Sequence, residues 1–362
     1  MVPDAVDVTA LSRALVVTFR HHGDVLLTSP VYTVLKHHAP RLEIDALVYD
    51  DTREMLTLHP AIASVHTVNR AWRQLSTVPR LAAELRLLRA LRARRYDLII
   101  SLTENPRGAW LARLLKPRYA VAPEHKHRGR LWSASFTHLY RLPPHARRHV
   151  VEVNLDALRR IGVYPGDDER RLVLVPGDDA EAAVSSRLST LGLANRDFIH
   201  LHPASRWRFK CWPAEKTAAL ADALAADGYP IVVTAAPSEP ELALVRAIRA
   251  ACRAEIIDLS GQLTLKQLAA LTRRARLFVG VDSAPTHIAA AMGTPAVALF
   301  GPSGELQWGP WRVAHRVVAS TEHPCRPCGN DGCGGGKVSE CLTTLPVAQM
   351  LAAARELLAM PR

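Results

Sequence analysis

Short apolar runs, often rich in β-branched residues, alternate along this chain with stretches in which apolar positions recur every three or four residues. The run at residues 14–19 (ALVVTF) is typical of a parallel strand buried on both faces, and residues 25–38 after it show the helical period. The same pattern predicts strands at 44–49, 64–68 and 97–102 and helices at 79–95 and 106–115. Such alternation with short links is typical of an α/β fold with a parallel sheet.

A second series of the same kind follows a stretch rich in Pro, Arg and Asp at residues 141–171. Its predicted strands are 198–201, 230–235, 256–259, 277–281 and 295–300, and its helices are 213–226, 239–251, 265–274, 284–292 and 346–358. Two consecutive series predict two doubly wound domains, at residues 1–170 and 171–345, with a cleft between them. Ligands of such sheets bind beyond the carboxyl ends of the strands, so the turns there are the places to seek chemistry.

The first of these turns is Arg20-His21-His22-Gly23-Asp24. Gly23 allows a tight turn before the next helix. Asp24 has two interpretations: it caps that helix, as Asp often does, or it is a general base at a cleft-facing turn.

The turn after the strand at 198–201 reads HPASRWRFKCWP. Ser205, Arg206 and Lys210 are suited to grip a diphosphate, with help from the helix that follows. Trp207 and Trp212 would stack on a sugar or pack in the core. A solvated basic loop is the alternative for the whole segment.

The turn after the strand at 277–281 carries Asp282 and Ser283, where helix capping and anion binding coincide. The free amides of the first helical turn would face a phosphate. Pro285 opens the helix without removing a needed donor. His287 is either a ligand contact or a core histidine. Residues 300–304 (FGPSG) form a fourth turn of this kind.

Three common motifs are missing from the sequence. There is no G-x-G-x-x-G after the first strand, no G-x-x-x-x-G-K-[ST] and no H-E-x-x-H. Their absence disfavours a nicotinamide-dinucleotide enzyme, a P-loop NTPase and a zinc protease of that motif class.

The 362 residues carry a formal charge of +12, which favours an acidic partner such as nucleic acid, anionic lipid or a phosphorylated glycan; an Arg-rich composition is the alternative. No apolar run is long enough to span a membrane, and the first ten residues do not resemble a secretion signal. We therefore expect a cytoplasmic protein that can dock on a membrane surface. The helix at 79–95 has six arginines against Glu84, which suits a phosphorylated lipid glycan, a membrane surface or a solvated face.

Four of the six cysteines crowd into one Gly-rich segment: Cys325, Cys328, Cys333 and Cys341. The C-x-x-C pair is regular and the remaining spacing is not. A structural zinc ion or an Fe–S cluster is one interpretation, and reduced thiols in a loop are the other.

Taken together, the segments RHHGDVLLTSPVYTVLK, HPASRWRFKCWP, VGVDSAPTHIAAAMGTPAVALFGPSG and QWGPW resemble glycosyltransferase family 9, the ADP-heptose:lipopolysaccharide heptosyltransferases. The HPASRWRFKCW segment is most similar to the heptosyltransferase III branch. The resemblance implies a GT-B fold, in which two Rossmann-like domains face a cleft and the final helix, within 346–362, returns to the first domain. It also implies ADP-heptose as donor, a lipid A-core glycolipid as acceptor, inverting transfer at the inner face of the inner membrane, and no obligatory metal.

The resemblance also assigns roles to residues. Asp24 matches the catalytic base and Lys210 the phosphate-contacting lysine, and the ribose-contacting acid falls near Ser238 or Glu239, with Glu241 as an alternative. The expected donor site is Ser205, Arg206, Lys210, Ser238, Glu239, Asp282, Ser283, Ala284, Pro285 and His287. The expected acceptor site is Arg20, His21, Gly23, Arg89 and Arg92.

Two other functions are open to a chain of this kind. One is a heptosyltransferase of another branch or a different GT-B nucleotide-sugar enzyme, such as an epimerase. The other is a basic nucleic-acid-binding protein, which no helix-turn-helix, RRM or zinc-finger pattern supports. We therefore expect no nucleic acid among the partners.

Overall fold

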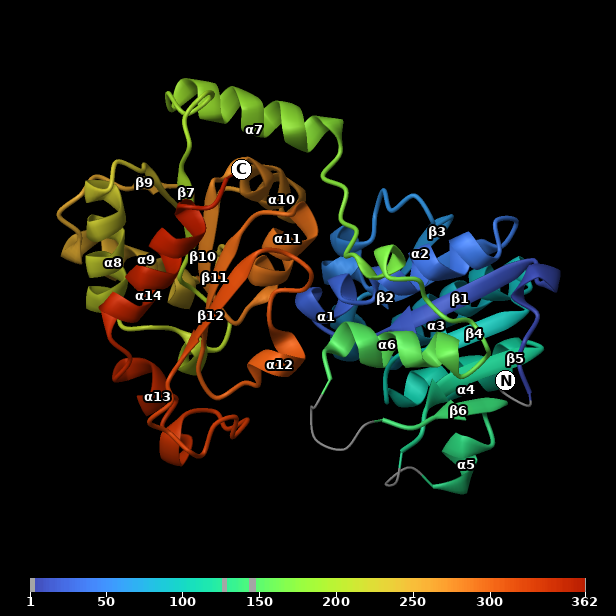
Figure 1. Ribbon diagram of the computed structural model, residues 1–362. Helices are drawn as coiled ribbons and strands as arrows, with labels where there is room; N and C mark the ends of the chain where they lie inside the picture. The colour runs from blue at the N-terminus through green and yellow to red at the C-terminus, as the bar shows by residue number, and fades with distance from the viewer. Residues whose placement is uncertain (1–3, 126–128, 143–147, 362) are drawn as a thin grey trace. The chain divides into compact units, whose positions relative to one another are not determined.

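The computed structural model describes residues 4–125, 129–142 and 148–361. The chain divides into two compact units, Met1–Leu174 and Val175–Arg362, and each has its own six-stranded parallel sheet with helices on both faces (Figure 1). The prediction of two Rossmann-like, doubly wound α/β domains is confirmed. No helix among the described residues is long and apolar enough to cross a membrane.

The first unit contains a sheet in the order β3-β2-β1-β4-β5-β6. Its strands are β1 (Arg13–Thr18), β2 (Glu43–Tyr49), β3 (Ser64–Val68), β4 (Leu98–Ser101), β5 (Tyr119–Pro123) and β6 (His138–Tyr140). Its α-helices are α1 (His22–Leu26), α2 (Ser29–His38), α3 (Thr77–Arg94), α4 (Pro106–Leu115), α5 (Arg130–Ser133) and α6 (Val150–Arg159). Short 3-10 turns are η1 (Val8–Ala10), η2 (Asp50–Met55), η3 (Arg70–Gln74) and η4 (Asp168–Arg170). The strand order reverses between β1 and β4, which is where ligands of such sheets bind.

The second unit repeats this topology with the order β12-β11-β10-β7-β8-β9. Its strands are β7 (Ile199–His202), β8 (Ile231–Val233), β9 (Ile257–Asp258), β10 (Leu277–Val281), β11 (Ala296–Phe300) and β12 (His315–Ala319). Its helices are α7 (Asp178–Thr190), α8 (Ala214–Ala226), α9 (Glu239–Ala251), α10 (Leu265–Arg274), α11 (Ala284–Met292), α12 (Glu305–Trp308), α13 (Glu340–Thr343) and α14 (Val347–Leu358), with 3-10 turns η5 (Arg208–Lys210) and η6 (Cys333–Gly335). The reversal here lies between β7 and β10.

The helix predicted at residues 25–38 is in fact two helices. Pro30 lies in the first turn of α2, where its missing N–H costs nothing, and so favours a new helix start. The Thr28 hydroxyl donates to the Val25 carbonyl at 2.7 Å and closes α1. The break leaves Asp24 on a short helix of its own.

The final helix, α14, packs on the sheet of the second unit. Its contacts are with α8 and with β10, β11 and β12. Met350, Ala354 and Leu357 are buried in the core of that unit. Its apolar face is thus covered by the second unit's own sheet. That the final helix also returns to the first unit stays a prediction.

A buried carboxylate fastens the C-terminal end of α3 to the first sheet. Asp45 of β2 accepts hydrogen bonds from Arg94 Nε at 2.8 Å and from the Tyr96 hydroxyl at 2.6 Å, and His66 Nε2 lies 3.4 Å away. Burial raises the pKa of Asp45, but the hydrogen bonds from His66, Arg94 and Tyr96 outweigh it and hold the pKa at about 2.

We expect Arg94→Met to lower the free energy of unfolding by about 3–5 kcal/mol at pH 7, because it leaves the Asp45 carboxylate buried beside a smaller set of donors. The depressed pKa of Asp45 stabilises the fold at pH values above about 4, and this contribution of about 2 kcal/mol is lost as pH falls towards 2. Urea unfolding of the wild type and of Arg94→Met at pH 7 and pH 3 measures the loss of stability and its dependence on pH. An Arg94→Met variant with wild-type stability at pH 7 would contradict the prediction.

Candidate functional site

Polar side chains gather in each unit at the point where the strand order reverses. In the first unit, the turn after β1 carries Asp24 on α1. In the second unit, the turns after β7 and β10 carry Lys210 and Asp282. Because the carboxyl ends of parallel strands share one edge of a sheet, residues distant in sequence meet there.

Asp24 lies in the first turn of α1 with its side chain partly exposed, 3.4 Å from Arg20 Nε. The N-cap residue, His21, has an extended backbone and makes no side-chain cap. Asp24 also follows the N-cap by three residues, so it is not the cap that one interpretation of the sequence proposed. An accessible carboxylate beside a guanidinium can accept a proton or bind a hydroxyl group.

The loop before Asp24 is held by a residue that the sequence reasoning missed. Arg70 of η3 donates to the Arg20 carbonyl at 3.0 Å and to Asp51 at 3.1 Å, and its guanidinium lies 3.7 Å from the centre of the Tyr49 ring. Arg70 lies two residues after the end of β3, so the rule that directs attention to strand ends would have found it.

The structure does not bring all of the expected acceptor residues together. Arg20, His21 and Gly23 share the turn of Asp24, whereas Arg89 and Arg92 lie near the C-terminal end of α3. That end sits at the amino edge of the sheet, since the Arg94 carbonyl accepts from Arg13, the first residue of β1. Arg92 donates to the Leu114 carbonyl of α4 at 3.3 Å. Arg89 and Arg92 therefore lie away from the edge of the sheet that carries Asp24.

The centre of the second site is an ion pair. Lys210 Nζ donates to Asp282 Oδ2 at 2.5 Å, and both side chains are largely buried. The ammonium also lies 5.1 Å from the centre of the Trp207 ring. An ammonium has three donors, so Lys210 retains hydrogen-bonding capacity for an anion while Asp282 holds it in place.

The loop between β7 and α8 places Ser205 close by and buried, and its hydroxyl accepts from the Trp207 amide at 3.3 Å. Arg206 is exposed. Trp212 packs in the core and donates to the Leu342 carbonyl at 3.0 Å, so of the two tryptophans only the half-exposed Trp207 is positioned to stack on a ligand. Burial raises the pKa of the Cys211 thiol to about 11, which leaves it protonated.

The start of α11 offers fewer backbone donors than we expected. The Asp282 amide donates to the Leu299 carbonyl and the Thr286 amide to the Ser283 carbonyl, each at 3.1 Å. Pro285 has no N–H. The amides of Ser283 and Ala284 are therefore the ones that this turn can offer a phosphate. His287 lies one turn on and is buried.

Ser238 and Glu239 lie at the start of α9, which follows β8. Ser238 is the N-cap residue, and exposed Glu239 forms an ion pair with Arg246 on the same helix. Glu241 is buried and accepts from the Ala236 amide at 3.0 Å, so its carboxylate supports the turn. Of the two acids, Glu239 is the more accessible to a ligand.

A chain of neutral, buried side chains runs from α10 through β7 to the end of β8. Thr272 donates to the Leu268 carbonyl at 2.6 Å and contacts His200 Nδ1 at 3.0 Å, and the Thr234 hydroxyl lies 2.7 Å from His200 Nε2 and 2.8 Å from His202 Nδ1. Burial lowers the pKa of His202 to about 4 and that of His200 well below its usual range. Both imidazoles are therefore neutral.

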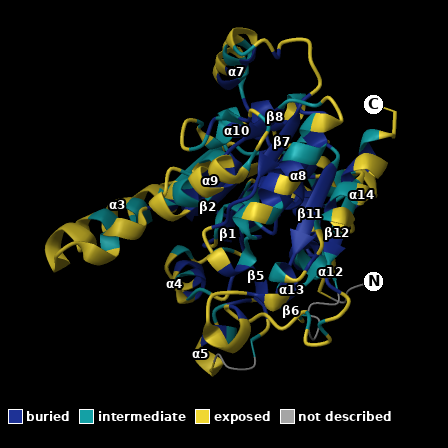
Figure 2. Cartoon of the chain, turned by 90° about the vertical axis from the view of Figure 1, so that its left-hand side faces the viewer, coloured by how far each residue is buried: buried dark blue, intermediate teal, exposed yellow. Residues whose placement is uncertain are grey.

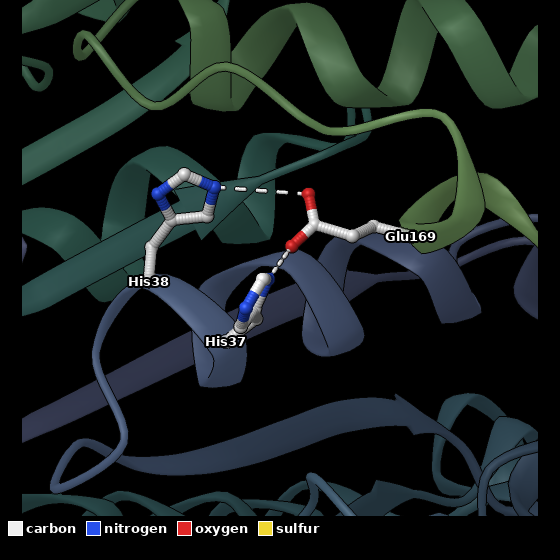
Figure 3. Close-up of side chains that lie close together, drawn as sticks. All are labelled: His37, His38 and Glu169. Atoms are coloured by element: carbon white, nitrogen blue, oxygen red, sulfur yellow. Dashed lines mark hydrogen bonds and ion pairs between the residues drawn. The ribbon is translucent and has the colours of Figure 1, made fainter.

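The four clustered cysteines are free, with three exposed and Cys341 buried. Among the described residues, one group of three metal-ligating side chains converges, and it contains no cysteine: His37, His38 and Glu169 (Figure 3). The structure thus gives no support to the predicted zinc or Fe–S site at Cys325, Cys328, Cys333 and Cys341.

The histidine group has a simpler explanation than a metal. One Glu169 oxygen contacts His37 Nδ1, and the other lies 3.7 Å from His38 Nε2. Burial raises the pKa of Glu169, but the hydrogen bonds from His37 and the Gly166 amide outweigh it and lower that pKa. These contacts fasten α2 to η4.

Comparison with known proteins agrees with this arrangement. The family model for glycosyltransferase family 9 (heptosyltransferase) matches residues 84–338. Lipopolysaccharide heptosyltransferase 3 of Escherichia coli is 37% identical over 294 residues, which are 81% of this chain and 84% of the relative. A family 9 glycosyltransferase from Veillonella parvula has a similar fold, with a TM-score of 0.83 and 24% identity over 98% of this chain and 99% of that one. The structure of E. coli ADP-heptose lps heptosyltransferase II is also similar, with a TM-score of 0.75 and 21% identity. The match covers 96% of this chain and 98% of that one.

Proposed function

Because this chain belongs to glycosyltransferase family 9, the heptosyltransferases, we propose that it transfers a heptose from ADP-heptose to a heptose of the lipopolysaccharide inner core, with inversion at the anomeric carbon. The relative that is 37% identical over most of both chains is a heptosyltransferase 3, which favours that branch. The observation that carries the proposal is the Lys210–Asp282 pair at the strand-order reversal of the second unit.

The second unit would bind the donor. Lys210, with the amides of Ser283 and Ala284, would neutralise the diphosphate as it leaves, which is electrostatic stabilisation without an obligatory metal. Asp282 would orient Lys210 or accept from hydroxyls of the heptose. The proposed donor site is Ser205, Arg206, Lys210, Ser238, Glu239, Asp282, Ser283, Ala284, Pro285 and His287.

The first unit would supply the base. Asp24 would take the proton from the acceptor hydroxyl as that oxygen attacks the anomeric carbon. The bond from this carbon to the ADP oxygen breaks from the opposite face, and ADP departs with the electron pair. Arg20, His21 and Gly23 would contact the acceptor from the same turn. A cytoplasmic protein at the inner face of the inner membrane would meet both substrates.

The test is a transfer assay with purified protein, ADP-heptose and core glycolipid from a strain that lacks this protein. We expect the glycolipid mass to rise by one heptose, and UDP-glucose in place of ADP-heptose to give no product. Loss of one side-chain heptose from the core of the deletion strain would support the branch. An unchanged core together with no transfer would contradict the proposal. Thermal stabilisation by a different nucleotide sugar would favour another GT-B enzyme.

A further inference from the structure

Helix α3 is 18 residues long, yet Leu91 is its one fully buried residue. Val78, Leu81 and Leu85 are exposed by 78%, 57% and 40%. Their spacing of three and four residues puts them on one side of the helix. Figure 2 shows α3 extending from the first unit, largely exposed. The three apolar side chains therefore form a stripe that faces solvent.

The neighbouring helices add to this stripe. Trp110 and Leu114, four residues apart on α4, and Leu131 on α5 are also exposed, Trp110 by 62% and Leu131 by 76%. Helices α3 and α4 place leucines against the same face of the first sheet, and Trp132 of α5 packs with Ala109 and Ala112 of α4, so the three helices adjoin one another. We call their solvent side the α3–α5 face, made up of Val78, Leu81, Leu85, Trp110, Leu114 and Leu131.

Polar contacts tie these helices together. Arg107 of α4 makes a two-pronged ion pair with Glu84 of α3, at 2.5 and 2.6 Å. Further along, Arg92 of α3 donates to the Leu114 carbonyl, and Arg113 of α4 donates to the Leu131 carbonyl at 2.7 Å. The exposed apolar residues are therefore held on a continuous layer.

The segment that carries most of this face is strongly basic. Residues 75–118 contain ten Lys and Arg against three Asp and Glu. One of those acids, Glu84, is already paired with Arg107. Arg80, Arg86 and Arg89 of α3 pair with no carboxylate in the part of the chain that the structure describes. Large apolar side chains among free cations are typical of a helix that lies in a membrane interface, where tryptophan is also favoured.

We infer that the α3–α5 face docks on the surface of an anionic lipid bilayer, with its apolar side chains in the interface and its arginines at the lipid phosphates. The positive charge of this face favours a membrane over a second copy of the chain. Two copies of the face would bring like charges together, whereas the negative charge of an anionic membrane complements them. The choice of a membrane rests on the proposed function, because its acceptor is a lipid-linked glycan.

The position of α3 relates the docking surface to the edge of the sheet that carries Asp24. Helix α3 begins three residues after η3, and η3 starts with Arg70, which holds the Arg20 carbonyl beside Asp24. The exposed half of α3 therefore lies towards the edge of the sheet that carries Asp24. Docking would bring that edge to the membrane surface from which a lipid-linked acceptor projects.

Vesicle sedimentation with the full chain tests this inference. We expect the protein to pellet with phosphatidylcholine vesicles containing phosphatidylglycerol, to bind less at high salt, and to stay in solution with pure phosphatidylcholine. Leu81→Gln with Leu85→Gln keeps helix propensity and should weaken binding by roughly tenfold or more. Arg86→Gln with Arg89→Gln should weaken binding at low salt and reduce its salt dependence. The matched control is Leu58→Gln with Leu306→Gln, two leucines that are 61% and 63% exposed elsewhere.

Two readouts keep this inference separate from the proposed function. The Leu81/Leu85 variant should melt at the wild-type temperature and bind ADP-heptose normally, and it should transfer heptose to a delipidated core oligosaccharide at the wild-type rate. Its transfer to glycolipid in vesicles should fall with its binding. Vesicle binding equal to wild type, or a loss shared with the Leu58/Leu306 control, would overturn the docking surface. So would sedimentation equilibrium showing a dimer that the Leu81/Leu85 variant dissociates.

Discussion

Asp24→Asn is expected to lower kcat for heptose transfer by about 10²–10⁴-fold, the range that a positioned general base supplies. The amide keeps the shape of the side chain, and Asp24 contacts only Arg20 among charged groups of the described chain, so the fold should persist. Binding of ADP-heptose should be unchanged, because the residues proposed to bind it belong to the second unit. Single-turnover kinetics and calorimetric titration measure the two quantities.

Asp50→Asn is the matched control for this variant. Asp50 follows β2, the strand beside β1, at the same edge of the sheet and is also partly exposed. It should retain wild-type turnover. If Asp24→Asn also turned over at the wild-type rate, Asp24 would not be the base.

Lys210→Met should weaken binding of ADP and ADP-heptose by roughly 10–100-fold, since charge-assisted hydrogen bonds contribute about 1.5–3 kcal/mol. It should also lower kcat, because the ammonium would act most strongly on the charge that develops on the leaving ADP. Lys210→Met leaves Asp282 buried without its cation, so part of its effect would be lost stability.

The double variant Lys210→Met with Asp282→Asn separates the two effects. It should recover the melting temperature that Lys210→Met loses, but not the affinity for ADP. Lys337→Met is the matched control, because Lys337 forms a 2.6 Å pair with Asp331 on an exposed loop. Full recovery of ADP affinity in the double variant would mean that Lys210 acts only by neutralising Asp282.

Much of the fold could be predicted because its strands are buried on both faces. The runs at β1, β10 and β11 are almost wholly apolar, and their period is plain. Strand β12 (HRVVA) was missed because it is half-buried, short and polar at its start. Helix α7 (DDAEAAVSSRLST) was missed because only three of its residues are buried, which leaves a weak period.

The sequence predicted which residues of the candidate site lie at strand ends, but not which of these residues contact one another. The rule that ligands bind at strand ends located Asp24, Lys210 and Asp282, but not the direct pairing of the last two, 72 residues apart. The same rule was not applied to β3, so Arg70 was missed. Arg89 and Arg92 were expected beside Asp24 because of their charge and their place in the acceptor domain. The sequence does not show that α3, at 18 residues, is about 27 Å long and carries its two ends to opposite edges of the sheet.

The threonine–histidine chain under β7 has a fixed direction. Since the Thr272 hydroxyl donates to a carbonyl, it must accept from His200, whose other nitrogen then accepts from Thr234, and Thr234 in turn accepts from His202. Each hydroxyl and imidazole proton in this chain thus has a single acceptor. An additional proton on either histidine would place a charge in the interior of the sheet. The two histidines of β7 therefore stay neutral from neutral to mildly acidic conditions. Any response of transfer to acidity in that range would then originate in groups outside this chain of side chains.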